Sequence, residues 1–176
     1  MTFRIDDFLS TIGGRGGLAM PNLYSIELPA IAGSNLTLNE KNITCKAMNL
    51  PGRQIATAER YIGPKAEKVP YAFMQDDVSL SFNITNDYAI RKYFDLWMNL
   101  IVNQTTYEIS YKTNYQKDVI LRAQQKTESN GMISPYSVRL EGAYPTTMNA
   151  NEFNNETTNG LVELNVQLSY YNWSPL

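Results

Sequence analysis

The sequence has no histidine and only one cysteine in 176 residues. Without histidine there is no Ser-His-Asp triad, no Cys-His catalytic pair and no histidine-ligated metal. A single cysteine forms neither an internal disulfide nor the usual thiolate zinc site. Cys45 lies within the stretch ITCKAM, where we expect a small buried core residue rather than a nucleophile.

The chain also lacks an excess of positive charge and any long apolar run. Its net charge is −2 and its 15 lysines and arginines are spread thinly, whereas DNA binding by counterion release needs clustered basic residues. No stretch approaches the roughly 18 apolar residues of a membrane helix. The opening residues, MTFRIDDFLSTIGGRGG, lack the apolar core and cleavage site of a signal peptide. We therefore expect no specific DNA binding, no membrane association and synthesis in the cytoplasm.

No group of residues indicates catalysis. Two carboxylate pairs, Asp6-Asp7 and Asp76-Asp77, are sequence neighbours. The second pair falls where a strand is expected to begin, so its side chains should face opposite ways rather than share a proton. The GGRGG stretch at 13–17 follows no strand and precedes no Lys-Ser/Thr, which favours a flexible linker over a phosphate loop. A glycosidase-like pair drawn from distant Asp and Glu residues stays open. We predict a protein that is not an enzyme, with no catalytic, cofactor or metal site.

What the sequence does contain is alternation of apolar and polar residues, the pattern of half-buried strands. Its apolar fraction of 43% and charged fraction of 18% are those of an ordinary folded domain. The alternation is clearest in VSLSFNI (78–84) and LVELNVQLSYY (161–171), whose apolar faces we assign to the core. Further strands are expected in NLYSIEL (22–28), ITCKAM (43–48), RQIATAERYI (53–62), EKVPYAFM (67–74), DVILRAQQK (118–126) and YSVRLEGAY (136–144).

Proline and glycine positions refine these strands. Pro70 lies inside a predicted strand and implies an edge or a bulge, because proline cannot donate to a ladder. Asn130-Gly131 is a turn signal between two strands. Pro145 and the small polar residues after it indicate that a strand stops there.

One segment breaks the period of two. In NDYAIRKYFDLWMNLI the apolar residues recur at helical spacing, with polar residues mostly opposite. We predict one amphipathic helix over about 87–101, capped by Asn86 or Asp87 and packed on the sheet. Strands interrupted by a single helix, without βαβ alternation, predict a mainly β fold: an antiparallel β-barrel or sandwich with one flanking amphipathic α-helix.

The polar faces of several strands are rich in Asn, Gln, Ser and Thr and nearly uncharged. On a monomer such a face would be solvated, and in a ring it could form the wall of a channel. A wall without concentrated positive charge would let a polyanion slide past, because each neutralised phosphate adds to binding.

Five segments occur in a recognisable order. MPNLYSIEL (20–28) opens with Pro-Asn-Leu-aromatic, and CKAMNLPG (45–52) has the form Cys-Lys-Ala-x-x-Leu-Pro. VPYAFMQDDVSLSFNITND precedes a helix segment RKYFDLW that ends in tryptophan. LEGAYPTTMNANEF contains Gly-x-aromatic-Pro-Thr, and VELNVQLSYYNW is a closing strand ending in aromatic residues. Collinear over about residues 20–173, these segments resemble the tail tube proteins of contractile-tailed bacteriophages.

The resemblance implies a single tail-tube β-barrel domain at 21–176, similar to the tube protein of type VI secretion systems, after a flexible N-terminal arm at 1–20. It implies hexameric rings that stack into a tail tube, the conduit for DNA ejection, in a virion tail assembled in the host cytoplasm. The implied partners are other copies of the chain and the tail sheath, baseplate and tape-measure proteins, while DNA passes through the lumen without specific binding. The Gly142–Thr147 segment is implied to end one barrel strand.

Two other functions stay open. The arm and the segment Ala32–Lys41 look like additions to a minimal tube subunit, which would suit a tube-initiating ring protein of the baseplate. A monomeric carbohydrate-binding β-sandwich would need exposed aromatic residues, but Trp97, one of only two tryptophans beside Trp173, lies on the predicted buried helix stripe. The region Arg53–Phe73 should project as a long hairpin, which the resemblance assigns to contacts with a neighbouring subunit or ring, the alternative being an ordinary exposed surface loop.

Overall fold

The computed structural model describes residues 4–126, 131–151, 153 and 160–176. Asn130 of the predicted Asn130-Gly131 turn lies outside these residues. The elements in chain order are α1 (Ile5–Gly14), β1 (Tyr24–Glu27), α2 (Leu38–Thr44), β2 (Cys45–Met48), β3 (Gln54–Ile62), β4 (Lys65–Met74), β5 (Val78–Asn83), α3 (Ala89–Ile101), α4 (Lys112–Tyr115), β6 (Lys117–Lys126), β7 (Met132–Met148), β8 (Glu163–Ser169) and β9 (Asn172–Pro175).

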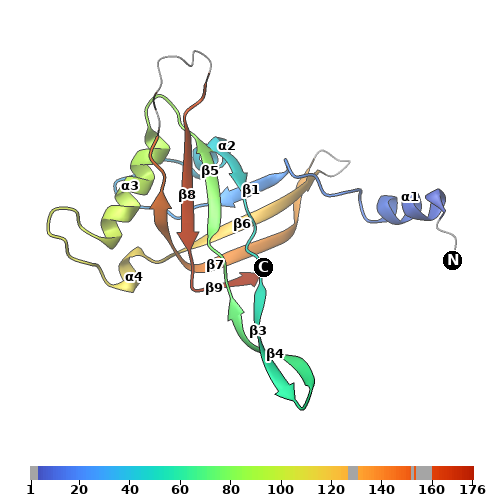
Figure 1. The fold of residues 1–176 in the computed structure, drawn as a ribbon. Helices are drawn as coiled ribbons and strands as arrows, with labels where there is room; N and C mark the ends of the chain where they lie inside the picture. The colour runs from blue at the N-terminus through green and yellow to red at the C-terminus, as the bar shows by residue number, and fades with distance from the viewer. Residues whose placement is uncertain (1–3, 127–130, 152, 154–159) are drawn as a thin grey trace.

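Seven strands form one antiparallel sheet in the order β1-β6-β7-β8-β5-β2, and β9 pairs with β7 beside that path. The strands β3 and β4 form a separate two-stranded sheet, which extends away from the body as a hairpin (Figure 1). The predicted mainly β, antiparallel fold is confirmed. Since β1 and β2 are the two edges of the large sheet and do not pair with each other, the sheet is not a closed barrel, and the sandwich is the nearer description.

Strand β7 joins the two layers of this sandwich. Its first half pairs with β6 and β9, and its second half pairs with β8. Between the halves, Gly142 has a φ of 63°, a left-handed conformation that glycine adopts without steric cost. The prediction that the strand stops at Pro145, within Gly142–Thr147, is wrong, because β7 continues to Met148. Pro145 is accommodated at a register shift between Pro145 and Thr147, one of the few sheet positions that tolerates proline.

Helix α3 supplies the centre of the core. Its residues Ile90, Tyr93, Phe94 and Trp97 are buried, and the ring of Phe94 lies 5.4 Å from that of Phe82 on β5. Two polar atoms on these rings have partners, as buried polar groups require. The Tyr93 hydroxyl donates to the Pro29 carbonyl at 2.7 Å, and the Trp97 indole donates to the Tyr115 carbonyl at 2.9 Å. The predicted amphipathic helix is confirmed.

The start of this helix differs from the prediction. The helix begins at Ala89, and its N-cap is Tyr88 with a left-handed φ of 55° rather than Asn86 or Asp87. The Asp87 carboxylate still accepts a hydrogen bond from the Ala89 amide at 3.4 Å and another from the Thr85 hydroxyl. These two hydrogen bonds, the one from Thr85 more than the one from Ala89, lower the pKa of the Asp87 carboxyl. The ionised carboxylate therefore stabilises the turn that precedes the helix.

Three shorter helices were not predicted. Helix α2 is closed by a capping box in which Thr37 and Glu40 exchange hydrogen bonds. It contains Ile43 and Thr44, so the strand predicted over 43–48 begins only at Cys45. Cys45 is buried as predicted, and burial raises the pKa of its thiol to about 11.

Helix α1 lies apart from the body (Figure 1) within the predicted arm, whose flexibility stays a prediction.

The facing of the two clearest strands is confirmed. Along β5 and β8 the buried positions alternate with more exposed ones. Val166 and Leu164 on β8 lie opposite Leu80 and Phe82 on β5, and all four side chains are buried. The polar residues between them therefore share the outer face.

Candidate assembly surfaces

The β3–β4 hairpin is the largest exposed element. Its strands pair from Gln54 and Met74 at the base to Ile62 and Lys65 at the tip, and hardly any residue along it is buried even partly. An isolated two-stranded hairpin is marginally stable in water. The predicted projection of Arg53–Phe73 is confirmed by this exposure, and among the described residues no other element packs along the length of the hairpin.

One face of the hairpin exposes large apolar side chains on either side of a charged pair. Ile55 and Phe73 are cross-strand partners near the base and are 54% and 71% exposed. Tyr61, six positions along β3 from Ile55 and so on the same face, is 70% exposed, and Glu59 with its partner Lys68 lies between them on that face. The Ile55–Phe73 pair is an exposed apolar patch of the kind that marks interaction sites. Pro70 lies beside the register shift of this hairpin, on a strand whose other edge is unpaired, so both predictions made for Pro70 hold.

A cation–π contact lies between the base of the hairpin and the body. The guanidinium of Arg53 lies over the ring of Trp173 on β9, 4.5 Å from its centroid. This cation–π contact sets the direction in which the hairpin leaves the body. It also occupies one face of the Trp173 ring, and Trp97, the other tryptophan, is fully buried.

The two edges of the large sheet approach each other without pairing. The Tyr24 hydroxyl on β1 donates to the Cys45 carbonyl on β2 at 3.0 Å, and the Ile26 amide donates to the Asn42 side-chain oxygen of α2 at 3.0 Å. Side chains therefore satisfy two of the backbone groups that a ladder would pair in a closed barrel. No local sequence signal indicates these contacts, because their partners are 21 and 16 residues apart.

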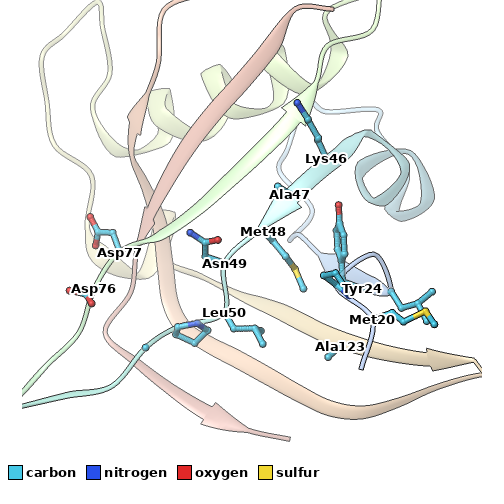
Figure 2. A pocket seen from close by; sticks show the side chains of 14 residues that line it. Met20, Tyr24, Lys46, Ala47, Met48, Asn49, Leu50, Asp76, Asp77 and Ala123 are labelled. Atoms are coloured by element: carbon cyan, nitrogen blue, oxygen red, sulfur yellow. The ribbon is translucent and has the colours of Figure 1, made fainter. Parts of the chain in front are cut away.

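A cavity of about 650 Å³ lies where these edges separate. Figure 2 shows Tyr24 and Met48 on the facing strands and Asp76 and Asp77 at the far end of the cavity. The Lys46 ammonium pairs with Glu163 on β8, and the Asp76 carbonyl accepts a hydrogen bond from the Tyr170 hydroxyl at 3.0 Å. Burial is the main cause that raises the pKa of both Tyr24 and Tyr170, so both phenols remain hydrogen-bond donors.

The outer face of β5 and β8 carries short uncharged polar residues. The Ser81 hydroxyl donates to the Asn165 side-chain oxygen at 2.6 Å, and Ser79 lies opposite Gln167. This is the polar face expected from the alternation. These four positions are uncharged, and the charged residue of this face, Glu163 opposite Asn83, is paired with Lys46.

The described residues contain no group of three or more histidine, cysteine, aspartate or glutamate side chains able to hold a metal ion. Among the helices of the same residues, none combines the length and apolar character needed to cross a membrane.

Comparison with known proteins gives a consistent result. Solved structures with a similar fold include a sheath-tube complex of the extracellular contractile injection system PVC in its extended state, with a TM-score of 0.64, 13% identity and coverage of 99% of each chain. The tube terminating cap of the anti-feeding prophage has a TM-score of 0.64 and 14% identity, over 90% of this chain and 91% of the other. The Hcp1 protein of the E. coli EAEC 042 pathovar has a TM-score of 0.52 and 11% identity, over 89% and 91%.

At such low identity these structures establish the fold alone, and no curated protein matches the chain in sequence. The sequence family described as phage tail tube protein matches residues 18–175, which include every strand and all helices but α1. The open sheet, the projecting hairpin and the predicted collinear segments all lie within that range. The chain belongs to the phage tail tube protein family.

Proposed function

We propose that this chain is the subunit of a hexameric-ring tail tube that forms the conduit for DNA ejection in a contractile phage tail. The observation that carries the proposal is the β3–β4 hairpin, which exposes Ile55, Tyr61 and Phe73 on one face. A neighbouring ring offers the surface on which such a hairpin can bury that face. Burying one such side chain fully stabilises a contact by about 1.5–3 kcal/mol, and six subunits per ring multiply the effect.

The open edges of the large sheet support the ring itself. A free strand edge promotes indefinite association unless it is covered or closed by symmetry. In a ring, β1 of one subunit and β2 of the next would complete each other's hydrogen bonding, a head-to-tail contact that closes when the rotation between subunits is right. The side-chain bridges between β1 and β2 within one subunit satisfy the edges only in part.

The polar face of β5 and β8 suits the lumen of such a tube. DNA would pass a wall of serine, asparagine and glutamine without specific binding, since counterion release would add little affinity there. The tube would sit in the virion tail, assembled in the host cytoplasm, in contact with tail sheath, baseplate and tape-measure proteins. The proposal requires no enzymatic activity and no cofactor.

Electron microscopy of the purified chain tests this function. Stacked rings or hollow tubes support it, and single particles at high concentration would contradict it. The double variant Ile55→Ser/Phe73→Ser should form rings that no longer stack. The matched control Arg60→Ser/Glu67→Ser alters a cross-strand pair on the opposite face of the same hairpin and should leave stacking unchanged.

A tube-initiating ring protein of the baseplate is the second candidate. The similarity to a tube terminating cap supports it, because there the fold occurs at the end of a tube. Isolated rings that recruit tube subunits without stacking would favour this candidate. For a carbohydrate-binding monomer neither tryptophan offers an open ring on both faces, since Trp97 is buried and Arg53 covers one face of Trp173.

A further inference from the structure

Helix α1 is amphipathic and packs against no other element in the part of the chain that the structure describes. Ile5, Phe8, Leu9 and Ile12 recur at helical spacing along one side, and none of the ten helix residues is buried. Ile5 is 78% exposed and Leu9 60% exposed. A ten-residue helix is marginal in water on its own, so this helix needs a surface that covers its apolar side.

The helix is tied to one end of β6. Gly17 donates to the Ile12 carbonyl at 2.9 Å and closes the helix, and the Gln125 side-chain amide donates to the Gly16 carbonyl at 2.8 Å. Gly16 has a φ of 78°, which favours glycine, and a Cβ there would lie 2.2 Å from that amide nitrogen, so Gln125 would have to move away and lose this hydrogen bond. Gln125 is the penultimate residue of β6, and α1 is therefore fixed at the C-terminal end of that strand.

An unfilled apolar groove lies at the opposite end of β6. It has a volume of about 680 Å³, and Tyr144 in its wall packs edge-on against Tyr115, two residues before β6 begins. No charged residue lines it. Its main lining residues are Met98, Ile101, Val102, Tyr107, Tyr144 and Pro145.

One wall of the groove is held in place by a tight turn. The Asn103 side-chain oxygen accepts from the Thr105 amide at 2.8 Å, and the Asn103 carbonyl accepts from the Tyr107 amide at 2.8 Å. Tyr107 has a φ of 57°, uncommon for a residue with a side chain, and is 82% exposed. The turn thus presents a large aromatic side chain beside the groove in a preformed position.

We infer that α1 of one copy docks in this groove of the next copy, an inference that rests on the proposed ring. The same chain cannot supply both parts. Eight residues of β6 separate Gln125 from Lys117, roughly 26 Å at about 3.3 Å per residue, and α1 is only about 15 Å long. Figure 1 shows α1 on one flank of the molecule and α4, with the end of α3, on the other. A protruding element on one flank and its receptor on the opposite flank give the head-to-tail contact that closes a ring.

Charge selects this groove over the other apolar hollow beside α3. That second hollow, of about 470 Å³, lies between α2 and the start of α3 and includes Glu40 and Asp87 in its lining. The first turn of α1 carries Asp6 and Asp7, which would meet like charges there. The uncharged groove imposes no such repulsion.

Cross-linking between two singly substituted chains tests the contact. Leu9→Cys and Val102→Cys chains, co-expressed and treated with a short bismaleimide, should give cross-linked dimers, and neither chain alone should. The native Cys45 is buried and stays unreacted. In a first control the Val102→Cys chain is replaced by an Ile43→Cys chain, whose cysteine lies in the second hollow, and the yield of cross-linked dimer should fall at least tenfold. In a second control Phe8→Ser is added to the Leu9→Cys chain, and the yield should fall by the same factor.

Each outcome is decisive. Rings seen by electron microscopy without the Leu9–Val102 cross-link, or with equal cross-linking to Ile43→Cys, would overturn the docking while leaving the ring proposal intact. A chain carrying both Leu9→Cys and Val102→Cys that cross-links only within itself would also overturn it. If the unsubstituted chain forms neither rings nor tubes, the proposed function and this inference fall together.

Discussion

Placing a carboxylate on the inner face of β8 should prevent the chain from folding. Val166 is 1% exposed and lies opposite Leu80 on β5 and Met148 on β7. Val166→Asp removes about 1.5–3 kcal/mol of apolar burial. A buried carboxyl group has its pKa raised by up to about 3–5 units. Because the ordinary pKa of aspartate, about 3.9, is only about three units below pH 7, this adds roughly 4 kcal/mol at neutral pH at about 1.4 kcal/mol per unit. The sum approaches the whole stability of an ordinary domain, about 5–15 kcal/mol.

The matched control is Asn165→Asp, which places the same charge one residue away on the outer face. Asn165 is exposed and accepts a hydrogen bond from Ser81 through a side-chain oxygen that aspartate retains, so its unfolding midpoint in urea should be nearly unchanged. For Val166→Asp, the destabilisation should shrink as the pH falls toward about 4, because the unfolded chain then binds the proton that the raised pKa already holds on the folded carboxyl. Cooperative unfolding of Val166→Asp at pH 7 with the midpoint of the unsubstituted chain would refute the assigned facing.

Three further predictions concern single sites. Thr37→Ala should destabilise the fold by about 1 kcal/mol through loss of the capping box, measured by urea unfolding. The hydrogen bond from the Thr37 amide lowers the pKa of the Glu40 carboxyl. Its contribution to folding stability should be present above the ordinary carboxyl pKa and should be lost as the pH falls through the lowered pKa of the folded state. Glu40→Gln should abolish this pH dependence. Gly142→Ala should cost about 1–2 kcal/mol from its left-handed φ alone, because the added Cβ meets only the Gln116 side chain at 3.4 Å. Cys45, whose pKa burial raises to about 11, should react with a thiol reagent only after denaturation, and rapid native labelling would contradict its burial.

The parts of the fold that could be predicted are those whose pattern is local and long. β5 and β8 alternate without interruption, and α3 repeats apolar residues over three turns, so periodicity identified each with the correct buried face. The edge or bulge position of Pro70 could also be predicted, because proline has no amide proton to donate to a neighbouring strand.

The errors arose where pairing between distant segments overrides a local signal. Pro145 should end a strand, but β7 changes partner from β6 to β8 at Gly142, and the register shift that accepts Pro145 depends on β8. Helix α2 has only seven residues, too few for periodicity to be read, although its Thr37–Glu40 capping box was visible in the sequence. The Tyr24–Cys45 bridge between the sheet edges joins residues with no recognisable motif.

The core of the chain buries or pairs its own apolar and polar groups, whereas several peripheral elements do not. The core around α3 buries its apolar side chains completely and gives its buried hydroxyl and indole groups partners within the same chain. The β3–β4 hairpin, helix α1 and the two sheet edges each present apolar or hydrogen-bonding groups that the chain does not cover. Burial of apolar surface supplies most of the free energy of folding. The core can therefore form before assembly, whereas the hairpin and α1 gain most of their stability from contact with a neighbouring copy. The elements that would join subunits are then the least stable in the free chain, so assembly and local ordering become one step, favourable only where a correctly placed copy supplies the missing surface.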